Sequence, residues 1–300
     1  MLNLKYLETF IRTAEAGSFR KAADLLYLTP SALIKQVDAL EDEVGTALFE
    51  RTPRGLKLTA AGASLLHDGR FLLAEAEAAI ARARQTVSSS DSIINVGSSP
   101  VTGTELIIDL LYEILPEWPE LRVQVIPFVN EPGRVSELFA KLGTDIDLIT
   151  GSTDAAHLAA RRCSGLTIET IPLCLAVPRH HPLSAKKKAA MEDLAEEKVF
   201  VLSKGKMEVM DKVQEDLKQR FPDISLVPFD FFGMDVFNRV VQENAVLVST
   251  EHWLKAHPML RKVDADWPYT AAYGILYARN PSAKIRRLLA LIQKQRHISV

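Results

Sequence analysis

The sequence predicts an α/β domain preceded by a smaller all-α domain, and three observations support this fold class. Apolar residues recur at helical spacing over residues 3–45. A second run of helical sequence extends from residue 59 to about residue 87. Beyond residue 92, short apolar segments typical of strands alternate with amphipathic segments typical of helices. This alternation favours a mostly parallel sheet with helices packed against it.

The first 45 residues indicate three consecutive helices. The first ends at Gly17, because glycine readily adopts the left-handed backbone that closes a helix. Ser18 is expected to cap a second helix, and Thr29 a third that begins at Pro30, where the missing N–H of proline costs nothing. Gly45 ends the third helix. The apolar stripes of the three helices consist of Leu4, Leu7, Phe10, Ile11 and Ala14, then Phe19, Ala22, Ala23 and Leu26, then Leu33, Val37 and Leu40.

Residues 48–58 predict a β-hairpin with a basic tip at Pro53-Arg54-Gly55. Added to the three helices, this hairpin completes a winged helix-turn-helix. Thr59 is expected to cap a helix over residues 59–87, about 43 Å long at about 1.5 Å per residue. An apolar residue recurs in it at every seventh position, which predicts pairing with a second helix and therefore a homodimer or homotetramer. These residues are Leu66, Leu73, Ile80 and Val87.

The remaining chain is expected to alternate between strands and helices after a hinge at the serine-rich residues 88–91. Strands are expected at 93–97, 121–128, 145–151, 170–177, 199–202, 224–229, 245–249 and 271–279. Helices are expected at 105–115, 135–142, 191–195, 208–220 and 235–243, with a closing helix from residue 281.

Composition excludes several classes of protein. The 300 residues contain no apolar run long enough to span a membrane and begin without an export signal, so a soluble cytoplasmic protein is expected. Net charge does not indicate nucleic acid, since residues 1–58 contain eight Lys and Arg against eight Asp and Glu. The two cysteines lack the spacing of a metal site, and motifs such as GxSxG, the P-loop or GxGxxG are absent. We therefore expect no enzyme, no metal and no cofactor.

A dense set of motifs lies near the N-terminus: AEAGSF at 14–19, AADLL at 22–26, TPSAL at 29–33, KQV at 35–37 and LFER at 48–51. Together they resemble the DNA-binding domain of LysR-type transcriptional regulators. DIDLI at 145–149 and VPRHHPL at 177–183 resemble later segments of the same family more loosely. The resemblance implies a winged helix-turn-helix at 1–58, a linker and dimerisation helix at 59–89, and an effector-binding domain at 90–300. That domain would be two-lobed and periplasmic-binding-protein-like, with lobe I at about 92–165 plus 271–300, lobe II at about 166–270, and two crossover strands between them.

The expected partner of the N-terminal domain is double-stranded DNA. The third helix presents a face opposite its apolar stripe to the major groove, the hairpin tip would reach phosphate or the minor groove, and the start of the second helix would contact the backbone. Pro30 and Ile34 depart from the polar residues usual in the family, so the target sequence cannot be read. The residues expected to contact DNA are Arg20, Lys21, Thr29, Pro30, Ser31, Ile34, Lys35, Asp38, Arg51 and Arg54.

A small-molecule effector, such as a small organic anion or an aromatic acid, is expected between the lobes. Hydroxyls that follow the first strand of the effector domain suit an anion, although each could instead cap a helix. The resemblance adds hydroxyls after two further strands, and nearby aromatic residues would form apolar walls unless they belong to the core. The expected residues are Ser98, Ser99, Thr102, Phe128, Thr150, Ser203, Phe232 and Met234.

Two alternatives remain open at this point. Residues 92–300 also suit a solute-binding protein of the transport type, although the helix-turn-helix and the missing export signal argue against it. A redox-sensing regulator that uses Cys163 and Cys174 is the other alternative. Cys174 lies in an apolar strand, where a buried and unreactive thiol is the usual state.

Overall fold

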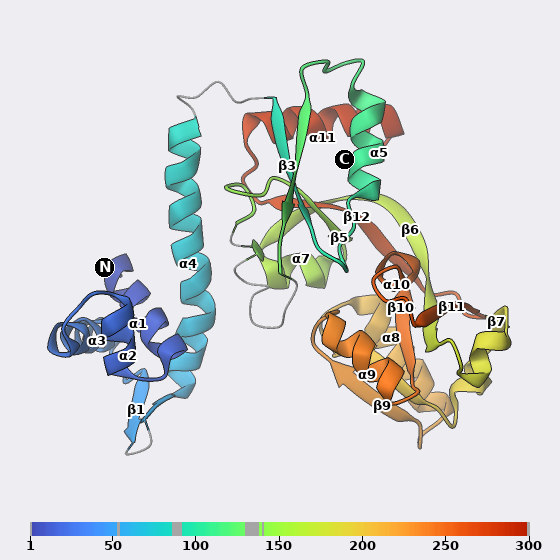
Figure 1. Cartoon of the computed structure of the whole chain (residues 1–300), viewed down its shortest axis with the longest axis horizontal. Helices are drawn as coiled ribbons and strands as arrows, with labels where there is room; N and C mark the ends of the chain where they lie inside the picture. The colour runs from blue at the N-terminus through green and yellow to red at the C-terminus, as the bar shows by residue number, and fades with distance from the viewer. Residues whose placement is uncertain (1, 53–54, 86–91, 130–137, 140, 299–300) are drawn as a thin grey trace. The chain divides into compact units, whose positions relative to one another are not determined.

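The computed structural model describes residues 2–52, 55–85, 92–129, 138–139 and 141–298. The chain divides into two compact units (Figure 1). The N-terminal unit comprises residues 1–86 and the C-terminal unit residues 87–300.

The predicted N-terminal helices are confirmed as α1 (Leu4–Ala16), α2 (Phe19–Leu25) and α3 (Pro30–Val44). Gly17 and Gly45 end α1 and α3 in the left-handed conformation, with φ of 64° and 79°. Thr29 caps α3, because its Oγ1 accepts a hydrogen bond of 3.2 Å from the backbone N–H of Ala32. Ser18 occupies the N-cap position of α2, but its hydroxyl makes no capping hydrogen bond.

The hairpin and the long helix follow as predicted. Strands β1 (Phe49–Thr52) and β2 (Gly55–Leu58) pair antiparallel. Helix α4 (Ala60–Gln85) begins after Thr59, whose Oγ1 accepts a hydrogen bond of 2.9 Å from the N–H of Gly62. Pro53, Arg54 and Val87 lie outside the described residues.

The sevenfold repeat of α4 does not form one continuous exposed stripe. Leu66 and Leu73 pack against the core of the N-terminal unit, whereas Ile80 is 54% exposed. Leu66 and Leu73 are only partly buried by that packing, so the pairing of α4 with a second helix stays a prediction. The small three-helix core needs this cover, and its fully buried members include Leu7, Phe10, Leu33, Val37, Leu40 and Leu48.

The C-terminal unit consists of strands interleaved with helices. Its first part contains β3 (Ile93–Ser98), α5 (Glu105–Ile114), β4 (Arg122–Pro127), β5 (Ile149–Ser152), α7 (Ala155–Arg161) and β6 (Cys163–Pro178). Its middle contains η1 (Pro182–Ala185), β7 (Lys188–Ala189), η2 (Met191–Leu194), β8 (Lys198–Leu202), α8 (Glu208–Arg220) and β9 (Ser225–Phe229). Its last part contains α9 (Met234–Gln242), β10 (Val246–Thr250), α10 (Glu251–Leu254), β11 (Leu260–Ala265), β12 (Thr270–Ala278) and α11 (Ala283–Arg296).

The sheets are mixed rather than mostly parallel, which corrects the prediction. β3 pairs parallel with β4, and β8 pairs parallel with β9 and β10. β6, however, runs antiparallel to β10, β11 and β12, and β5 runs antiparallel to β12. The difference arises because β6 and β12 run side by side in opposite directions through the unit (Figure 1).

Two large hydrophobic cores make the C-terminal unit two-lobed, and a third, smaller cluster contains Leu138, Leu142 and Ile146. One core contains β3, α5 and α11, and its members include Val96, Leu110 and Leu288. The other surrounds β8, β10 and α8. β6 and β12 contribute residues to both cores, for example Leu166 to the first and Leu173 to the second. These are the two crossover strands that the family resemblance implies.

Several elements depart from the sequence prediction. The strand expected over 145–151 begins only at Ile149, because the chain before it forms turns and isolated bridges. β6 begins seven residues before the strand expected over 170–177, in a polar stretch held by its pairing with β12. α7 and β11 were not expected, and the helix near 191–195 is the short 3₁₀ turn η2. The helix expected over 135–142 lies largely outside the described residues.

Candidate functional site

The exposed side of α3 begins at its first turn. Ser31 and Lys35 are exposed and lie one turn apart, which places them on the same side of the helix. The hydroxyls of Thr29 and Ser31 lie 3.2 Å apart. Ile34 and Asp38 are half-buried. Of the other residues expected to contact DNA, Arg20, Lys21 and Pro30 are exposed, the backbone of Arg51 lies in β1, and Arg54 lies outside the described residues.

The hairpin is held to α3 by a partly buried polar contact. Oε1 of Glu41 accepts hydrogen bonds from the N–H groups of Leu48 (2.6 Å) and Phe49 (3.1 Å). A charged acceptor strengthens such bonds. The position of β1 relative to α3 therefore depends on one carboxylate.

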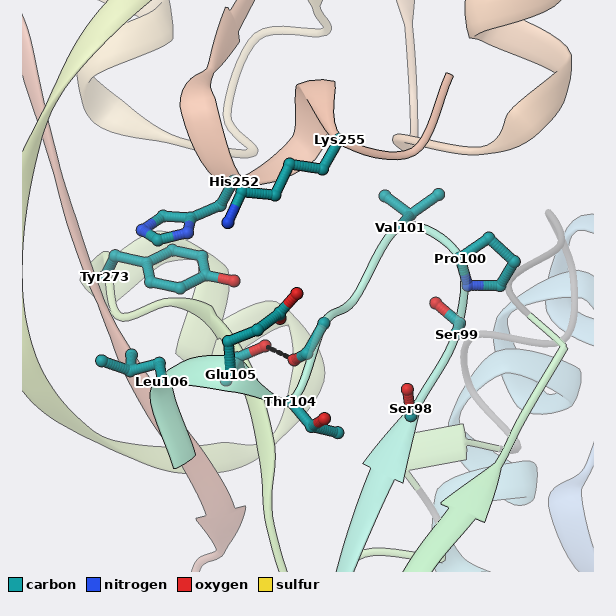
Figure 2. Close-up of a pocket in the computed structure, with 12 residues that line it drawn as sticks. Ser98, Ser99, Pro100, Val101, Thr104, Glu105, Leu106, His252, Lys255 and Tyr273 are labelled. Atoms are coloured by element: carbon teal, nitrogen blue, oxygen red, sulfur yellow. Dashed lines mark hydrogen bonds between the residues drawn. The ribbon is translucent and has the colours of Figure 1, made fainter. Parts of the chain in front are cut away.

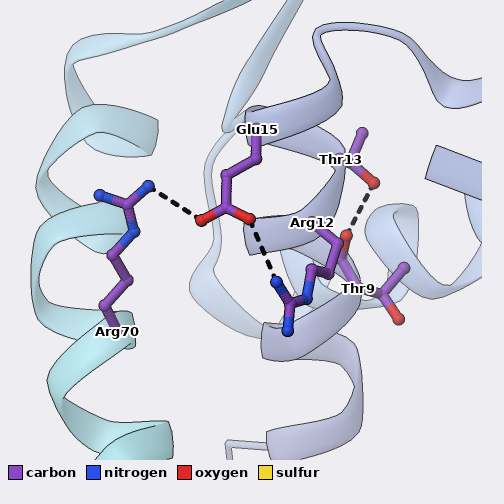
Figure 3. Close-up of polar contacts among 5 residues, drawn as sticks. All are labelled: Thr9, Arg12, Thr13, Glu15 and Arg70. Carbon is purple, nitrogen blue, oxygen red and sulfur yellow. Dashed lines mark hydrogen bonds and ion pairs between the residues drawn. The ribbon is translucent and has the colours of Figure 1, made fainter. Parts of the chain in front are cut away.

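Helices α1 and α4 are joined by an ion pair (Figure 3). Nη2 of Arg70 lies 2.9 Å from Oε1 of Glu15, and Nη1 of Arg12 lies 3.5 Å from the other oxygen. Beside it on α1, the Thr13 hydroxyl donates a hydrogen bond of 2.7 Å to the Thr9 carbonyl. Each partly exposed pair adds at most about 1 kcal/mol, so their main effect is to fix the angle between the helices.

A pocket of about 270 Å³ lies in the C-terminal unit where β3, β5 and β12 approach α5 and α10 (Figure 2). Polar groups enter it from both lobes. Its lining consists of Ser98, Ser99, Pro100, Val101, Gly103, Thr104, Glu105, Leu106, Thr150, His252, Lys255 and Tyr273.

The hydroxyls of lobe I are held by backbone contacts. The Ser99 and Thr102 backbones exchange hydrogen bonds of 3.0 and 3.1 Å, and the Ser99 hydroxyl also accepts from the N–H of Thr102 at 3.0 Å. The Thr150 hydroxyl donates to the carbonyl of Gly103 at 2.8 Å. The loop between β3 and α5 is thereby a preformed turn.

The floor of the pocket is aromatic and consists of Tyr273 on the crossover strand β12 and His252 on α10. The rings of His252 and Tyr273 stack with centroids 4.4 Å apart, and Nε2 of His252 lies 2.8 Å from Oε1 of Glu169 on β6. Burial raises the pKa of the Tyr273 phenol to about 12, so this group is neutral at physiological pH. The pairing of β6 with β12 shifts register between Tyr273 and Gly274. Tyr273 therefore links the pocket to an irregularity in the crossover strands.

Two opposite charges face the pocket without meeting. Glu105 is the first residue of α5 and Lys255 follows α10, and both side chains line the pocket (Figure 2). Among the described residues, neither has an ion-pair partner within 4.0 Å.

The pocket brings together only some of the residues expected to bind an effector. Ser98, Ser99 and Thr150 line it, and Thr102 closes the adjoining turn. Phe128 instead lines a separate cavity of about 440 Å³ beside Leu138. The other expected residues, Ser203, Phe232 and Met234, do not line this pocket.

Phe232 belongs to the core of lobe II. It is 7% exposed and stacks on Trp253 with ring centroids 4.0 Å apart.

Sequence reasoning missed Glu105, His252, Lys255 and Tyr273. His252 and Lys255 could have been found, because they follow the end of a strand just as Ser98 and Ser99 do.

The two cysteines lie far apart. Both occur in β6, eleven residues from each other, which is roughly 36 Å of extended strand. Both are buried, and burial raises the pKa of Cys163 to about 11 and that of Cys174 to about 12.

Within the part of the chain that the structure describes, no three His, Cys, Asp or Glu side chains gather as metal ligands. In the same residues, no helix is long and apolar enough to cross a membrane.

Two family models match the chain. The model described as "Bacterial regulatory helix-turn-helix protein, lysR family" matches residues 4–63, and the model described as "LysR substrate binding domain" matches residues 88–296. The crystal structure of CbnR, a LysR family transcriptional regulator, is similar with a TM-score of 0.62 and 20% identity, covering 98% of this chain and 99% of that chain. That likeness shows a shared fold.

Named relatives belong to the same class. The chain is 29% identical over 203 residues to the HTH-type transcriptional regulator AlsR of Bacillus subtilis (strain 168). It is 30% identical over 208 residues to a hydrogen peroxide-inducible genes activator of Pectobacterium carotovorum subsp. carotovorum. Each match covers 68% of this chain and 65% of the relative, slightly less than two thirds of the relative's length. With both family models matched in order along the sequence, the chain belongs to the LysR family of transcriptional regulators.

Proposed function

We propose that the protein binds double-stranded DNA through α3 and the β1–β2 hairpin and regulates transcription in response to a small effector. The observation that carries the DNA-binding proposal is the exposed N-terminal half of α3, with Ser31 and Lys35 on one side, on a helix whose opposite side is fully buried. A helix of this kind fits the major groove, where lysine and serine can contact base edges or phosphates.

The proposed domain division follows the family pattern. Residues 1–58 would form the DNA-binding domain, 59–89 the linker and dimerisation helix, and 90–300 the effector domain. Within the effector domain, lobe I would comprise about 92–165 plus 271–300, and lobe II about 166–270. We further propose a homodimer or homotetramer in the cytoplasm.

A binding measurement tests the DNA proposal. Fluorescence anisotropy with the promoter region beside the protein's own gene should detect binding that weakens as salt increases. Lys35→Ala should lower the affinity, because it removes a charge from the exposed side of α3. Lys218→Ala, an equal loss of charge in α8, is the matched control. Absence of binding by the folded wild-type protein at low salt would refute the proposal.

The proposed effector site is the pocket at the start of α5, and its ligand carries a carboxylate. Lys255 and the hydroxyl of Ser99 favour a negative group. Phe128 and Phe232, which were expected to form aromatic walls, lie outside the pocket, whose aromatic residues are His252 and Tyr273.

A thermal-shift screen of carboxylates tests the effector site. A compound that raises the melting temperature of the wild-type protein should bind more weakly to Ser99→Ala, since Ser99 lines the pocket. Ser203→Ala, an identical change outside the pocket lining, should leave the affinity unchanged. Equal affinity of the wild type and Ser99→Ala would contradict the placement.

The redox-sensing alternative is favoured by the name of one relative, a hydrogen peroxide-inducible genes activator, but not by the positions of the two cysteines. A transport-type solute-binding protein would have no use for the N-terminal unit. A disulfide between Cys163 and Cys174 would require sulfurs separated along one strand to meet.

A further inference from the structure

We propose that the effector is a small zwitterion, carrying an ammonium group for Glu105 as well as a carboxylate for Lys255. This inference rests on the effector site proposed above and names the class of its ligand. The pocket would therefore recognise a compound of the amino-acid type rather than a simple organic acid.

The position of Glu105 is the main argument. It is the first residue of α5, where unpaired backbone N–H groups and the helix dipole attract negative charge. Its carboxylate lies back over Gly103, where it would collide with a Cβ atom placed on that glycine. A negative side chain therefore already occupies the part of the pocket that would otherwise attract an anion.

The second argument is the distance between the opposite charges. Lys255 enters from lobe II and Glu105 from lobe I, and no ion pair joins them. A ligand with a single negative charge would satisfy Lys255 but would face the carboxylate of Glu105 without compensation. A ligand with both charges satisfies both groups.

The remaining lining fits the rest of such a ligand. The hydroxyls of Ser98 and Ser99 offer hydrogen bonds on the lobe I side. Pro100, Val101 and Leu106 offer a short apolar wall. The volume of about 270 Å³ favours a compact molecule.

Matched ligand sets test the proposal. Isothermal titration of the full-length protein is carried out with the standard amino acids, with the carboxylic acids that lack their amino group, and with the amines that lack their carboxylate. At least one amino acid should bind about 10-fold or more tightly than both of its matched compounds, as expected when each charge has its own partner.

Charge variants then assign the two groups. Glu105→Gln should weaken the binding of the amino acid about 10-fold. The affinity for the matched carboxylic acid should stay unchanged or increase. Lys255→Met should weaken both compounds. Asp109→Asn, which removes an equal charge from an exposed position of α5 outside the pocket lining, should change neither.

The outcomes separate this inference from the site on which it rests. If carboxylic acids bind as tightly as amino acids, or no amino acid binds, the zwitterion is refuted. In that case the effector site still stands wherever Ser99→Ala and Lys255→Met weaken a carboxylate ligand. If a tightly bound amino acid is unaffected by Glu105→Gln, Ser99→Ala and Lys255→Met, both the inference and the site are refuted.

Discussion

The most deeply buried ion pair of the described residues joins Asp147 to Lys284. Nζ of Lys284 lies 2.7 Å from Oδ2 of Asp147, and the two side chains are 10% and 4% exposed. The same carboxylate oxygen accepts a hydrogen bond of 2.8 Å from the N–H of Asn95, and Lys284 also donates to the carbonyl of Ile93. The pair therefore ties α11 to the start of β3 and to the segment before β5.

Removal of Lys284 should leave a buried charge without a partner. We expect Lys284→Met to lower the free energy of unfolding by about 3 kcal/mol, measured by urea denaturation at neutral pH. The double variant with Asp147→Asn and Lys284→Met should lose less free energy of unfolding than Lys284→Met alone, because no unpaired charge then remains. Equal loss in the single and double variants would show that packing, and not charge, explains the effect.

The pH dependence of this pair has a definite sign. Burial, although opposed by Asn95 and Lys284, raises the pKa of Asp147 above its usual range. The folded state therefore binds a proton more readily than the unfolded state, and the contribution of Asp147 to stability falls as pH rises from the usual carboxyl pKa through the raised one. In Lys284→Met the loss should be smaller at acidic pH than at neutral pH, since protonation removes the isolated charge.

The thiols provide a test of the redox alternative. Both are buried with pKa values raised to about 11 and about 12, so hardly any reactive thiolate exists at neutral pH. A thiol reagent should label neither Cys163 nor Cys174 in the folded protein and both after denaturation. Rapid labelling of the folded protein would reopen the redox alternative.

The role of a single residue was predictable from sequence wherever that role depends on the neighbouring backbone. Thr29, Gly17 and Gly45 act at helix ends, and the backbone next to them determines their role. Ser99 was predictable because it follows a strand. Tyr273 was not, because it lies within a crossover strand and reaches the pocket only when that strand folds against lobe I.

At the scale of elements, two glycines let α4 pack closely against its neighbours. A Cβ on Gly62 would collide with the carbonyl oxygen of Leu48, which is backbone and cannot move aside easily. A Cβ on Gly69 would lie 2.8 Å from Cδ1 of Leu7, the end of a flexible side chain. A side chain at Gly62 would therefore require the backbone of Leu48 to move, whereas at Gly69 only the end of the Leu7 side chain would have to move.

Alanine at these two positions should have different effects on stability. In a helix, alanine is more favourable than glycine by about 1 kcal/mol. Gly69→Ala should thus be close to neutral, whereas Gly62→Ala should destabilise the N-terminal unit by about 2 kcal/mol because of overpacking. Thermal unfolding followed by circular dichroism measures both, and an equal effect of the two changes would contradict this reasoning.

Elements with strong periodicity or clear caps were predicted almost to the residue, as α8 and α3 show. Elements that depend on distant partners were not. The first half of β6 contains only a short alternating segment at residues 166–169, and its strand conformation is held by pairing with β12. β11 likewise lies against β6 and β7.

At the scale of the whole molecule, the proposed oligomer depends on the second half of α4. Leu66 and Leu73 are occupied within their own unit, so Ile80 is the member of the repeat left exposed among the described residues. Ile80→Asp should shift the protein towards monomer in light scattering. Ala79→Asp, about 100° away round the helix axis, is the control. An unchanged mass of Ile80→Asp would argue against pairing through this part of α4.

The two-lobed plan was predictable through the family resemblance, and the mixed direction of its strands was not. Alternation of strands and helices along the chain reveals the order of elements but not which strands cross between the lobes. The antiparallel direction of β6 and β12 is evident only from their pairing with each other in the folded structure.

The stacking of Trp253 on Phe232 has a practical consequence. Trp253 lies between the pocket residues His252 and Lys255 in sequence, yet its indole is buried in lobe II. A ligand that shifts α10 when it binds Lys255 should change the surroundings of this stacked pair. The intrinsic fluorescence of the protein should therefore change when the pocket fills, and occupancy can be followed in real time without attaching a dye.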